Sequence, residues 1–305
     1  MDAPHLPVLY EEIITALQPR ASGKYIDGTL GAGGHAAGIL QASAPAGELL
    51  GLDLDPQALA IASQRLAPFG GRAHLAQASY TEMTERAHAL GWQAVDGILL
   101  DLGVSSMQID TPARGFSFLE DGPLDMRFDP QATRSAAELL NTLEENELAD
   151  ILFRYGEERQ ARKIARLITQ NRPLNSTRQL ADLLLKTFGR RERIHPATRT
   201  FQALRIAVNG ELEAVEQVLP LAANLLRRGG RLAVISFHSL EDRLVKEYFR
   251  RESRDCLCPP RQPLCTCGHH ASLRELNRKP LEAGAPEILV NTRARSAKLR
   301  VVEKL

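Results

Sequence analysis

The fold is decided by the stretch Gly23-Lys24-Tyr25-Ile26-Asp27-Gly28-Thr29-Leu30-Gly31-Ala32-Gly33-Gly34-His35. A short β-type run, Tyr25-Ile26, leads into an acid and then into a loop with four glycines. A second apolar run, Leu49–Leu52, ends in Asp53. Glycines let a backbone approach a ligand closely, and an acid at the end of the second strand accepts hydrogen bonds from a ribose diol. The stretch therefore predicts a strand–loop–helix–strand unit that holds a nucleotide.

The acid at the start of the loop bears on which nucleotide is bound. Gly31, Gly33 and Ala36 match the dinucleotide fingerprint only loosely, because that pattern places a pyrophosphate on a helix N-terminus. Asp27 would repel a pyrophosphate but would attract an ammonium or a sulfonium group. This favours S-adenosylmethionine over a nicotinamide dinucleotide. A plain strand–turn–helix without a ligand is the alternative.

The composition is that of an ordinary globular protein. The chain has 305 residues, of which 44% are apolar and 25% charged, and its formal net charge is +1. No apolar run approaches the ~20 residues that span a bilayer, and no basic region precedes an apolar one at the N-terminus. We expect a cytoplasmic protein with no membrane partner.

Short apolar runs alternate with helical patterns through the first hundred residues, which predicts a parallel, doubly wound α/β sheet. Ligands of such sheets bind at the carboxyl ends of the strands, so we expect Asp27, Asp53 and Asp101 to line one crevice. The expected strands are Tyr25-Ile26, Leu49–Leu52, Ala73–Ala76, Val95–Leu100, a run from Gly229 to Ser236, and Leu299–Val302.

A helical segment interrupts this sheet pattern. Residues 107–134 are irregular, and residues 135–228 carry apolar side chains at three- and four-residue spacing. We therefore expect a discontinuous α/β domain (1–106 and 229–305) with an inserted all-helical domain (107–228). The expected helices are Ser135–Leu143, Asn146–Tyr155, Gln160–Asn171, Thr177–Phe188 and Thr198–Arg227.

Charge is distributed unevenly along the chain. Residues 119–158 hold eleven acids against three arginines, whereas residues 186–205 hold a single acid. Basic patches on a near-neutral protein favour a phosphate-bearing partner, although solvated helix faces are an alternative. The basic residues of the second stretch are Lys186, Arg190, Arg191, Arg193, Arg199 and Arg205.

All four cysteines lie in one short window, as Cys256-x-Cys258 and Cys265-x-Cys267. A disulfide framework would spread its cysteines through the chain, so reduced thiols are the better interpretation. Four thiolates can surround a tetrahedral zinc ion, but the common spacing is Cys-x-x-Cys. Reduced thiols without a metal, or one disulfide that closes a hairpin, are the alternatives to a zinc site.

Several further blocks stand beside the glycine loop. With that loop, they closely resemble the bacterial small-subunit rRNA cytosine-N4 methyltransferases, the MraW family, from about residue 5 to the C-terminus. The blocks are His5-Leu-Pro-Val-Leu9, Asp101-Leu-Gly-Val-Ser-Ser106, Gly115-Phe-Ser-Phe118, Pro123-Leu-Asp-Met-Arg-Phe-Asp129, His195-Pro-Ala-Thr-Arg-Thr-Phe-Gln-Ala-Leu-Arg-Ile206, Ser236-Phe-His-Ser-Leu-Glu-Asp-Arg243 and Arg293-Ala-Arg-Ser-Ala-Lys-Leu-Arg300.

The resemblance implies a class I Rossmann-like methyltransferase sheet with an inserted helical domain. It implies S-adenosylmethionine as methyl donor and, as substrate, the N4 amine of a decoding-centre cytosine in 16S rRNA within the small ribosomal subunit. By motif, it implies that the cofactor is contacted by Gly33, Gly34, His35, Asp53, Tyr80, Asp101 and Gln108, with Asp53 on the ribose.

The chemistry requires an acceptor near a weakly nucleophilic amine, together with in-line alignment of the reacting atoms. Asp101 either organises the cofactor and the active site, which we favour, or accepts a hydrogen bond from the amine. A backbone carbonyl of residues 102–105, His238 or Asp125 are further candidates for the acceptor. His238 has the alternative role of orienting Glu241 or Asp242.

Methylation of a base in structured RNA requires the nucleotide to be splayed into a pocket. The aromatic rings of Phe116, Phe118 and Phe237 could stack on the base, although each could equally be a core residue. Arginine forks match phosphate geometry. The arginines proposed to contact RNA are Arg127, Arg199, Arg205 and Arg243.

Three other functions fit parts of the sequence. A DNA amino-methyltransferase would carry a proline pair after the central strand, where this chain has Asp101-Leu-Gly-Val104, so we expect no DNA substrate. An NAD-dependent oxidoreductase rests only on the loose glycine match. A non-catalytic ribosome-assembly factor would keep the fold, and it would still associate with RNA after Asp53→Ala.

Overall fold

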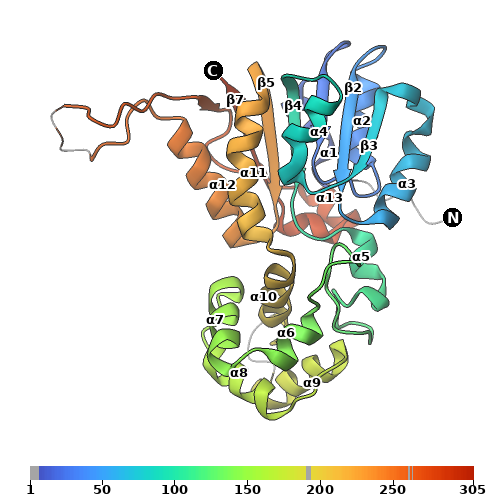
Figure 1. Cartoon of the computed structure of the whole chain (residues 1–305), viewed down its shortest axis with the longest axis vertical. Coiled ribbons are helices and arrows are strands. Elements are labelled where there is room, and N and C mark those ends of the chain that lie inside the picture. Colours follow the sequence, from blue (N-terminus) through green and yellow to red (C-terminus); the bar gives the residue numbers. More distant parts are fainter. Residues whose placement is uncertain (1–6, 190–193, 260–261, 263) are drawn as a thin grey trace. The chain divides into compact units, whose positions relative to one another are not determined.

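The computed structural model describes residues 7–189, 194–259, 262 and 264–305. His5 and Leu6 of the first sequence block, and Arg190, Arg191 and Arg193 of the basic stretch, lie outside the described residues. The chain forms two compact units (Figure 1). We call residues 1–103 with 212–305 the sheet unit, and residues 104–211 the helical unit.

One seven-stranded sheet organises the sheet unit, with the strand order β3-β2-β1-β4-β5-β7-β6. Strands β1 to β5 are parallel, and β7 runs antiparallel to both β5 and β6. The order reverses between β1 and β4, which is where open α/β sheets bind their ligands. The strands are β1 Lys24–Asp27, β2 Glu48–Asp53, β3 Ala73–Gln77, β4 Val95–Asp101, β5 Leu226–Ser236, β6 Leu273–Glu275 and β7 Lys298–Lys304.

Successive residues of the central strands face opposite sides, and both sides are buried. Ile26, Ile98 and Val234 belong to one core, whereas Tyr25 and Leu99 belong to the other. Burial on both faces explains why these strands appear in the sequence as continuous apolar runs. The prediction of a parallel, doubly wound α/β sheet is confirmed.

Helices cover both faces of this sheet. Helices α4, α11 and α12 contribute to the core that contains Ile26, and α1, α2 and α3 to the core that contains Tyr25. The helices and 3₁₀ turns of this part are α1 Tyr10–Leu17, α2 Gly34–Ala42, α3 Pro56–Leu66, η1 Ala67–Arg72, η2 Tyr80–Glu82, α4 Met83–Ala89, α11 Glu211–Leu225, α12 Ser239–Glu252, α13 Ala285–Val290 and η4 Thr292–Ser296.

The helical unit has its own core, formed by apolar faces of α6 to α10 together with Leu124 and Met126. Side-chain caps set the starts of several helices, since Ser135 and Ser176 accept hydrogen bonds from the backbone N–H groups of Glu138 and Gln179. The elements are α5 Ser106–Asp110, η3 Pro112–Arg114, α6 Ala136–Thr142, α7 Glu145–Gly156, α8 Ala161–Gln170, α9 Thr177–Phe188 and α10 Thr198–Asn209.

The expected helix Thr198–Arg227 is two helices in the structure. Gly210 ends α10 in the left-handed region, at φ 60°, and α11 begins at the next residue. Val215, Val218 and Ala222 of α11 pack in a core of the sheet unit. The units therefore separate at residues 211/212 rather than at 228/229, and at 103/104 rather than at 106/107.

Within the described part of the chain, no helix combines the length and the apolar character that a bilayer-spanning segment needs.

Candidate active site

Three carboxylates end three neighbouring strands of the sheet unit. Asp53, Asp27 and Asp101 are the last residues of β2, β1 and β4, and these strands are adjacent in that order. Parallel strands bring their carboxyl ends to one edge of the sheet. The structure therefore places the three acids on one edge, which we call the strand-end edge.

Asp27 is the most deeply buried of these acids, with 1% of its surface exposed. Its Oδ1 accepts a hydrogen bond of 3.2 Å from the backbone N–H of Thr29. The pKa of Asp27 is raised to about 7, mainly because burial disfavours its charged form. The neighbouring His35 lowers this pKa, whereas the charges of Asp101 and Asp53 raise it. The charged form of Asp27 is poorly solvated, so it would gain from a cationic group.

Asp53 uses both carboxylate oxygens to hold the loops around it. Oδ2 accepts a hydrogen bond from the N–H of Gly31 at 2.7 Å, and Oδ1 accepts one from the N–H of Asp55 at 2.9 Å. Burial raises the pKa of Asp53, although these two hydrogen bonds lower it. A carboxylate has about four lone-pair sites. Asp53 can therefore order the glycine loop and still accept from a ribose diol.

The glycine loop begins helix α2, and its glycines are required by packing. Gly33 is the N-cap residue at φ 75°, and a Cβ there would lie 3.3 Å from Cβ of Ala62. A Cβ on Gly34 would lie 2.5 Å from Cγ of Pro7. These two Cβ positions therefore meet the protein itself. Among the described residues no side chain caps α2, so its first amides can serve a ligand.

His35 and Asp101 carry polar atoms that the described residues do not satisfy. Both ring nitrogens of His35 and Oδ1 of Asp101 are buried without a hydrogen-bond partner. His35 Nε2 lies 3.7 Å from Oδ2 of Asp101, too far for a hydrogen bond. The ring of Tyr10 stacks on His35 at 6.3 Å. Buried polar groups are normally paired, so this pattern indicates a site that a ligand completes.

Tyr80 lies beside the same loop. A Cβ on Gly28 would lie 3.0 Å from Cβ of Tyr80 and 2.7 Å from Cδ2 of Leu100. Tyr80 opens the turn η2 and is partly buried against the sheet. Its position suits the contact expected for an aromatic ring with adenine.

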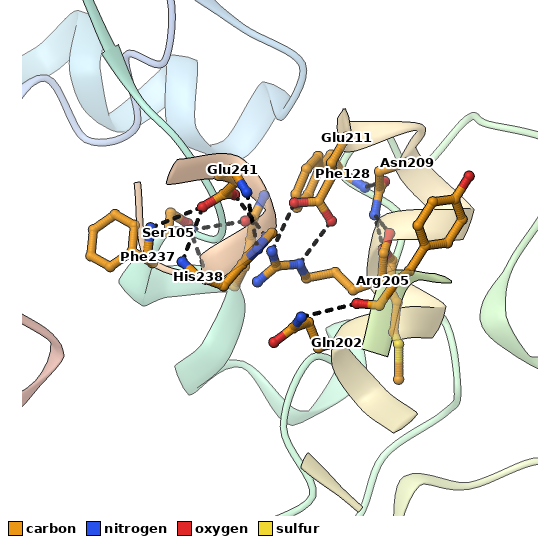
Figure 2. A network of polar contacts seen from close by, with 12 residues as sticks. Ser105, Phe128, Gln202, Arg205, Asn209, Glu211, Phe237, His238 and Glu241 are labelled. Atoms are coloured by element: carbon orange, nitrogen blue, oxygen red, sulfur yellow. Dashed lines mark hydrogen bonds and ion pairs between the residues drawn. The ribbon is translucent and has the colours of Figure 1, made fainter. Parts of the chain in front are cut away.

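The end of β5 contributes a second polar group, which Figure 2 shows around Glu241. Oε2 of Glu241 accepts hydrogen bonds from the N–H groups of Phe237 at 2.8 Å and His238 at 3.3 Å. His238 is the N-cap of α12: its Nδ1 accepts from the N–H of Glu241 at 3.4 Å, and its Nε2 lies 3.1 Å from Glu241 Oε1. The ring of His238 therefore caps α12, while its buried Nε2 makes no hydrogen bond with the described residues.

Glu241 and Thr29 are site residues that the sequence reasoning underrated. Glu241 is 1% exposed, and a Cβ on Gly103 would lie 3.6 Å from Phe237 and 4.0 Å from Glu241. Oγ1 of Thr29 accepts a 2.6 Å hydrogen bond from the N–H of Asp101, which ties the glycine loop to β4. For Glu241, the sequence signal was its position three residues after His238, which is the spacing of a capping box.

The residues that follow Glu241 form a separate ion pair. Arg300 of β7 donates to Asp242 of α12 through Nε at 2.7 Å and through Nη2 at 3.2 Å. Burial would raise the pKa of Asp242, but the hydrogen bonds and charge of Arg300 hold it below its usual value. This α12–β7 pair accounts for Asp242 in the sequence block 236–243 and for Arg300 in the block 293–300. Arg243, the next residue, is exposed.

Gln108 lies in the helical unit and is 5% exposed. Its Oε1 accepts from the N–H of Ser105 at 3.0 Å, and its own N–H donates to Oγ of Ser105 at 3.2 Å. This capping box gives Gln108 a local role at the start of α5.

Two of the four arginines proposed to contact RNA hold carboxylates instead. Arg127 forms a fork to Asp125 at 2.8 and 2.7 Å and also donates to the carbonyl of Ala132. Arg205, with only 15% of its side chain exposed, forms a second fork to Glu211 at 2.7 and 2.8 Å (Figure 2). Both arginines stabilise the helical unit.

The hydrogen bonds from Arg127 hold the pKa of Asp125 below its usual value, although burial raises it. A carboxylate held in this way is a poor general base. Arg199 lies 4.0 Å from Glu158 and lines a pocket with His195 and Phe188. Phe116 stacks on Phe128 at 5.6 Å, so it is engaged in the helical unit.

The strand-end edge fits S-adenosylmethionine, a cationic ligand that carries hydrogen-bond donors. A cationic group would favour the ionised form of Asp27. His35 and Asp101 offer polar atoms that have no partner among the described residues, and Asp53 retains acceptor capacity.

The chain is similar to proteins named ribosomal RNA small subunit methyltransferase H. Identity is 54% with that of Trichlorobacter lovleyi (99% of this chain, 98% of the relative). It is 52% with that of Thermomicrobium roseum (99% and 94%) and 50% with that of Citrifermentans bemidjiense (100% and 99%).

Likeness to solved structures is weaker. An rRNA methylase from Streptococcus thermophilus overlaps with a TM-score of 0.45 at 10% identity, covering 99% of each chain. An overlap at this level carries no argument about function. Residues 2–305, however, match the family described as the MraW methylase family. The match confirms the resemblance found in the sequence, and with it the Rossmann-like methyltransferase fold. The chain belongs to the MraW methylase family, whose cofactor is S-adenosylmethionine.

Proposed function

We propose that this protein methylates the exocyclic N4 amine of a decoding-centre cytosine in 16S rRNA, with the small ribosomal subunit rather than DNA as its partner in the cytoplasm. The observation that carries the proposal is identity of 50–54% over nearly full length with proteins named ribosomal RNA small subunit methyltransferase H. The absence of a proline pair after Asp101 supports the choice of RNA over DNA.

The strand-end edge would hold S-adenosylmethionine, which supplies the methyl group when bound. Asp53 accepts from the ribose diol with its remaining lone pairs, and Tyr80 packs against adenine. The uncapped amides at Gly34 and His35 bind the amino-acid portion, and the buried charge of Asp27 favours its cationic groups. Gln108 belongs to the same proposed set.

Asp101 is proposed to organise the active site and to be the first candidate acceptor for the amine. Its Oδ1 is buried without a partner, so it is available to accept from an N–H group. Accepting from the amine would draw electron density toward nitrogen, and the proton would then pass to this carboxylate or to water. His238 is the second candidate acceptor: its Nε2 is also buried without a hydrogen-bond partner among the described residues, while its ring caps α12 beside Glu241.

The helical unit is proposed to recognise RNA. Arg199, which is partly exposed beside a pocket, and Arg243 of the sheet unit are the better candidates for phosphate contacts. Arg127 and Arg205 would act by holding the fold of the helical unit, because their forks already bind carboxylates.

A methyl-transfer assay tests the proposal. The substrates are small subunits isolated from cells that lack this enzyme, and free 16S rRNA, each with tritiated S-adenosylmethionine. We expect label in the subunits, recovered by nucleoside analysis as N4-methylcytidine. Label on carbon 5, or in neither substrate, would refute the assignment.

Asp101→Asn is the matched variant, because it keeps the shape of the side chain and removes its charge. We expect kcat to fall by about 10²-fold or more, with subunit binding unchanged. A variant with full activity would remove Asp101 from the mechanism while leaving the substrate assignment intact.

A further inference from the structure

The four cysteines come together at one point of the sheet unit. They lie between α12 and β6, where the described residues of 253–272, which we call the arm, extend away from the sheet in Figure 1. Their four sulfur atoms all lie within 4.8 Å of one another. Six residues separate the two Cys-x-Cys pairs in the sequence, and the structure brings both pairs to one centre.

The sulfur–sulfur distances fit a tetrahedral metal site. Cys256 Sγ lies 3.4 Å from Cys265 Sγ and 3.8 Å from Cys267 Sγ, and the sulfurs of Cys265 and Cys267 are 3.6 Å apart. Four thiolates about 2.3 Å from a zinc ion at the corners of a tetrahedron are about 3.8 Å apart. A disulfide would bring two sulfurs to about 2.05 Å. The observed spacing is that of ligands around an ion.

Backbone N–H groups point at three of the sulfurs. Leu257 donates to Cys267 Sγ at 3.3 Å, while Cys258 and Thr266 donate to Cys256 Sγ and Cys258 Sγ, each at 3.4 Å. Hydrogen bonds of this kind stabilise negative charge on sulfur and orient the ligands. The arm is therefore folded in a way that favours thiolates.

The arm has little else to hold it in shape. None of the described residues from 253 to 272 is buried, so apolar packing does not stabilise its path. Segments without a core usually depend on disulfides or a structural metal. The cysteines are free in the structure, so they make no disulfide, and a metal held by them would supply a crosslink for the arm.

We propose that Cys256, Cys258, Cys265 and Cys267 bind one Zn²⁺ in a closed, structural site. Four sulfur ligands fill the tetrahedral coordination and leave no position for substrate, which separates this site from the strand-end edge. Binding forms four Zn–S bonds and releases the thiol protons to solvent. Zinc is the preferred ion because tetrahedral S₄ sites take zinc or iron, and zinc needs no redox chemistry to enter.

Metal analysis of the full-length protein is the first test. We expect about one zinc per chain after purification in the presence of a reductant. Cys258→Ser and Cys265→Ser remove one ligand from each pair, and each should reduce the zinc content at least fivefold. Leu264→Ala is the control, because this exposed neighbour of Cys265 offers no ligand, and its zinc content should match the wild type.

A second test does not depend on variants. Co²⁺ added to the reduced, metal-free wild type should give the absorption bands of tetrahedral thiolate coordination, and Zn²⁺ should abolish them. Limited proteolysis should cut the arm about tenfold faster after metal removal, because the arm then opens more often. Iron in place of zinc, cysteines paired as disulfides in the reduced protein, or no cobalt bands would each overturn the proposal.

Discussion

Two buried carboxylates in the sheet unit show opposite behaviour. Asp27 at the strand-end edge is 1% exposed, and Asp242 at the α12–β7 pair is 8% exposed. The pKa of Asp27 is raised to about 7 because burial removes its solvent, whereas Arg300 holds the pKa of Asp242 below its usual value. Burial raises the pKa of both carboxyls, more strongly at Asp27, and the cation beside Asp242 outweighs this effect there.

The surroundings of the two acids follow the same contrast. At the α12–β7 pair, Arg300 meets both oxygens of Asp242, and Lys298 lies 3.8 Å away. At the strand-end edge, His35 and Asp101 keep buried polar atoms that have no partner among the described residues. A buried unpaired polar group costs about 1–3 kcal/mol. The first region is complete in the folded chain, and the second region is arranged for a ligand.

The largest effect is expected at the α12–β7 pair. Arg300→Ala would leave Asp242 buried without its main partner, which costs about 3–5 kcal/mol in the free energy of unfolding. Urea denaturation at pH 7.5 measures this loss. Because the pKa of Asp242 is lowered in the folded protein, the loss should shrink as the pH falls and Asp242 becomes protonated.

Arg274→Ala is the control for this prediction. Arg274 also pairs with a carboxylate, Glu303 at 2.6 Å, but 61% of its side chain is exposed. Its loss should cost less than about 1 kcal/mol. Equal losses for Arg274→Ala and Arg300→Ala would show that burial of the pair does not matter.

The next effect concerns Asp27 and has the opposite pH dependence. Between the ordinary value of 3.8 and about 7, the folded protein holds a proton on Asp27 that the unfolded chain has released. The free energy of unfolding should therefore fall as the pH rises through this window, by about 4 kcal/mol from this group. Denaturation of the cofactor-free protein at pH 4.5, 6 and 7.5 measures the fall.

Asp27→Asn removes the titrating group, so its stability should depend less steeply on pH over the same window. The comparison of the two slopes isolates Asp27 from all other groups. Parallel slopes for wild type and variant would mean that Asp27 is charged throughout, and the contrast with Asp242 would then fail.

A smaller effect is expected when Asp53 is changed, and it appears in cofactor binding. Asp53→Asn keeps the shape of the side chain but weakens acceptance from Gly31, Asp55 and a ribose diol. We expect the Kd for S-adenosylmethionine, measured by calorimetry, to rise about 10–100-fold. This rise corresponds to a loss of about 1.4–2.8 kcal/mol in the free energy of binding. Asp96→Asn is the control at the amino-terminal edge of the sheet, and its Kd should stay within a factor of about two of the wild-type value.

Much of the sheet unit could be predicted from the sequence, because buried parallel strands appear as apolar runs and the acids stand at their ends. The partners of individual charges could not be predicted. The sequence did not indicate the carboxylates that Arg127 and Arg205 contact, because these partners are set by loop and helix geometry. The break at Gly210 was missed because apolar spacing continues from α10 into α11.

The glycine loop shows a subtler limit. Its pattern predicted a site at the first strand end, and the glycines were interpreted as room for a ligand. At Gly33 and Gly34 the space for a Cβ is filled by Ala62 and Pro7. A single sequence cannot distinguish a glycine that approaches a ligand from one that approaches its own protein, because both lack a side chain for steric reasons.

The smallest effect is expected at His238 and decides between its two interpretations. Asn is a good N-cap residue, so His238→Asn should keep a hydrogen bond to the N–H of Glu241 and change the free energy of unfolding by less than about 1 kcal/mol. If capping is the role of His238, kcat should also stay within about threefold, whereas His238→Ala, which has no cap, should lose stability. A drop of about 10²-fold in kcat at unchanged stability would instead make His238 a general base. The buried Glu241 contacts both nitrogens of this ring, one through its backbone N–H and one through its carboxylate. Glu241 would then orient a catalytic group, and the strand-end edge would extend to the start of α12.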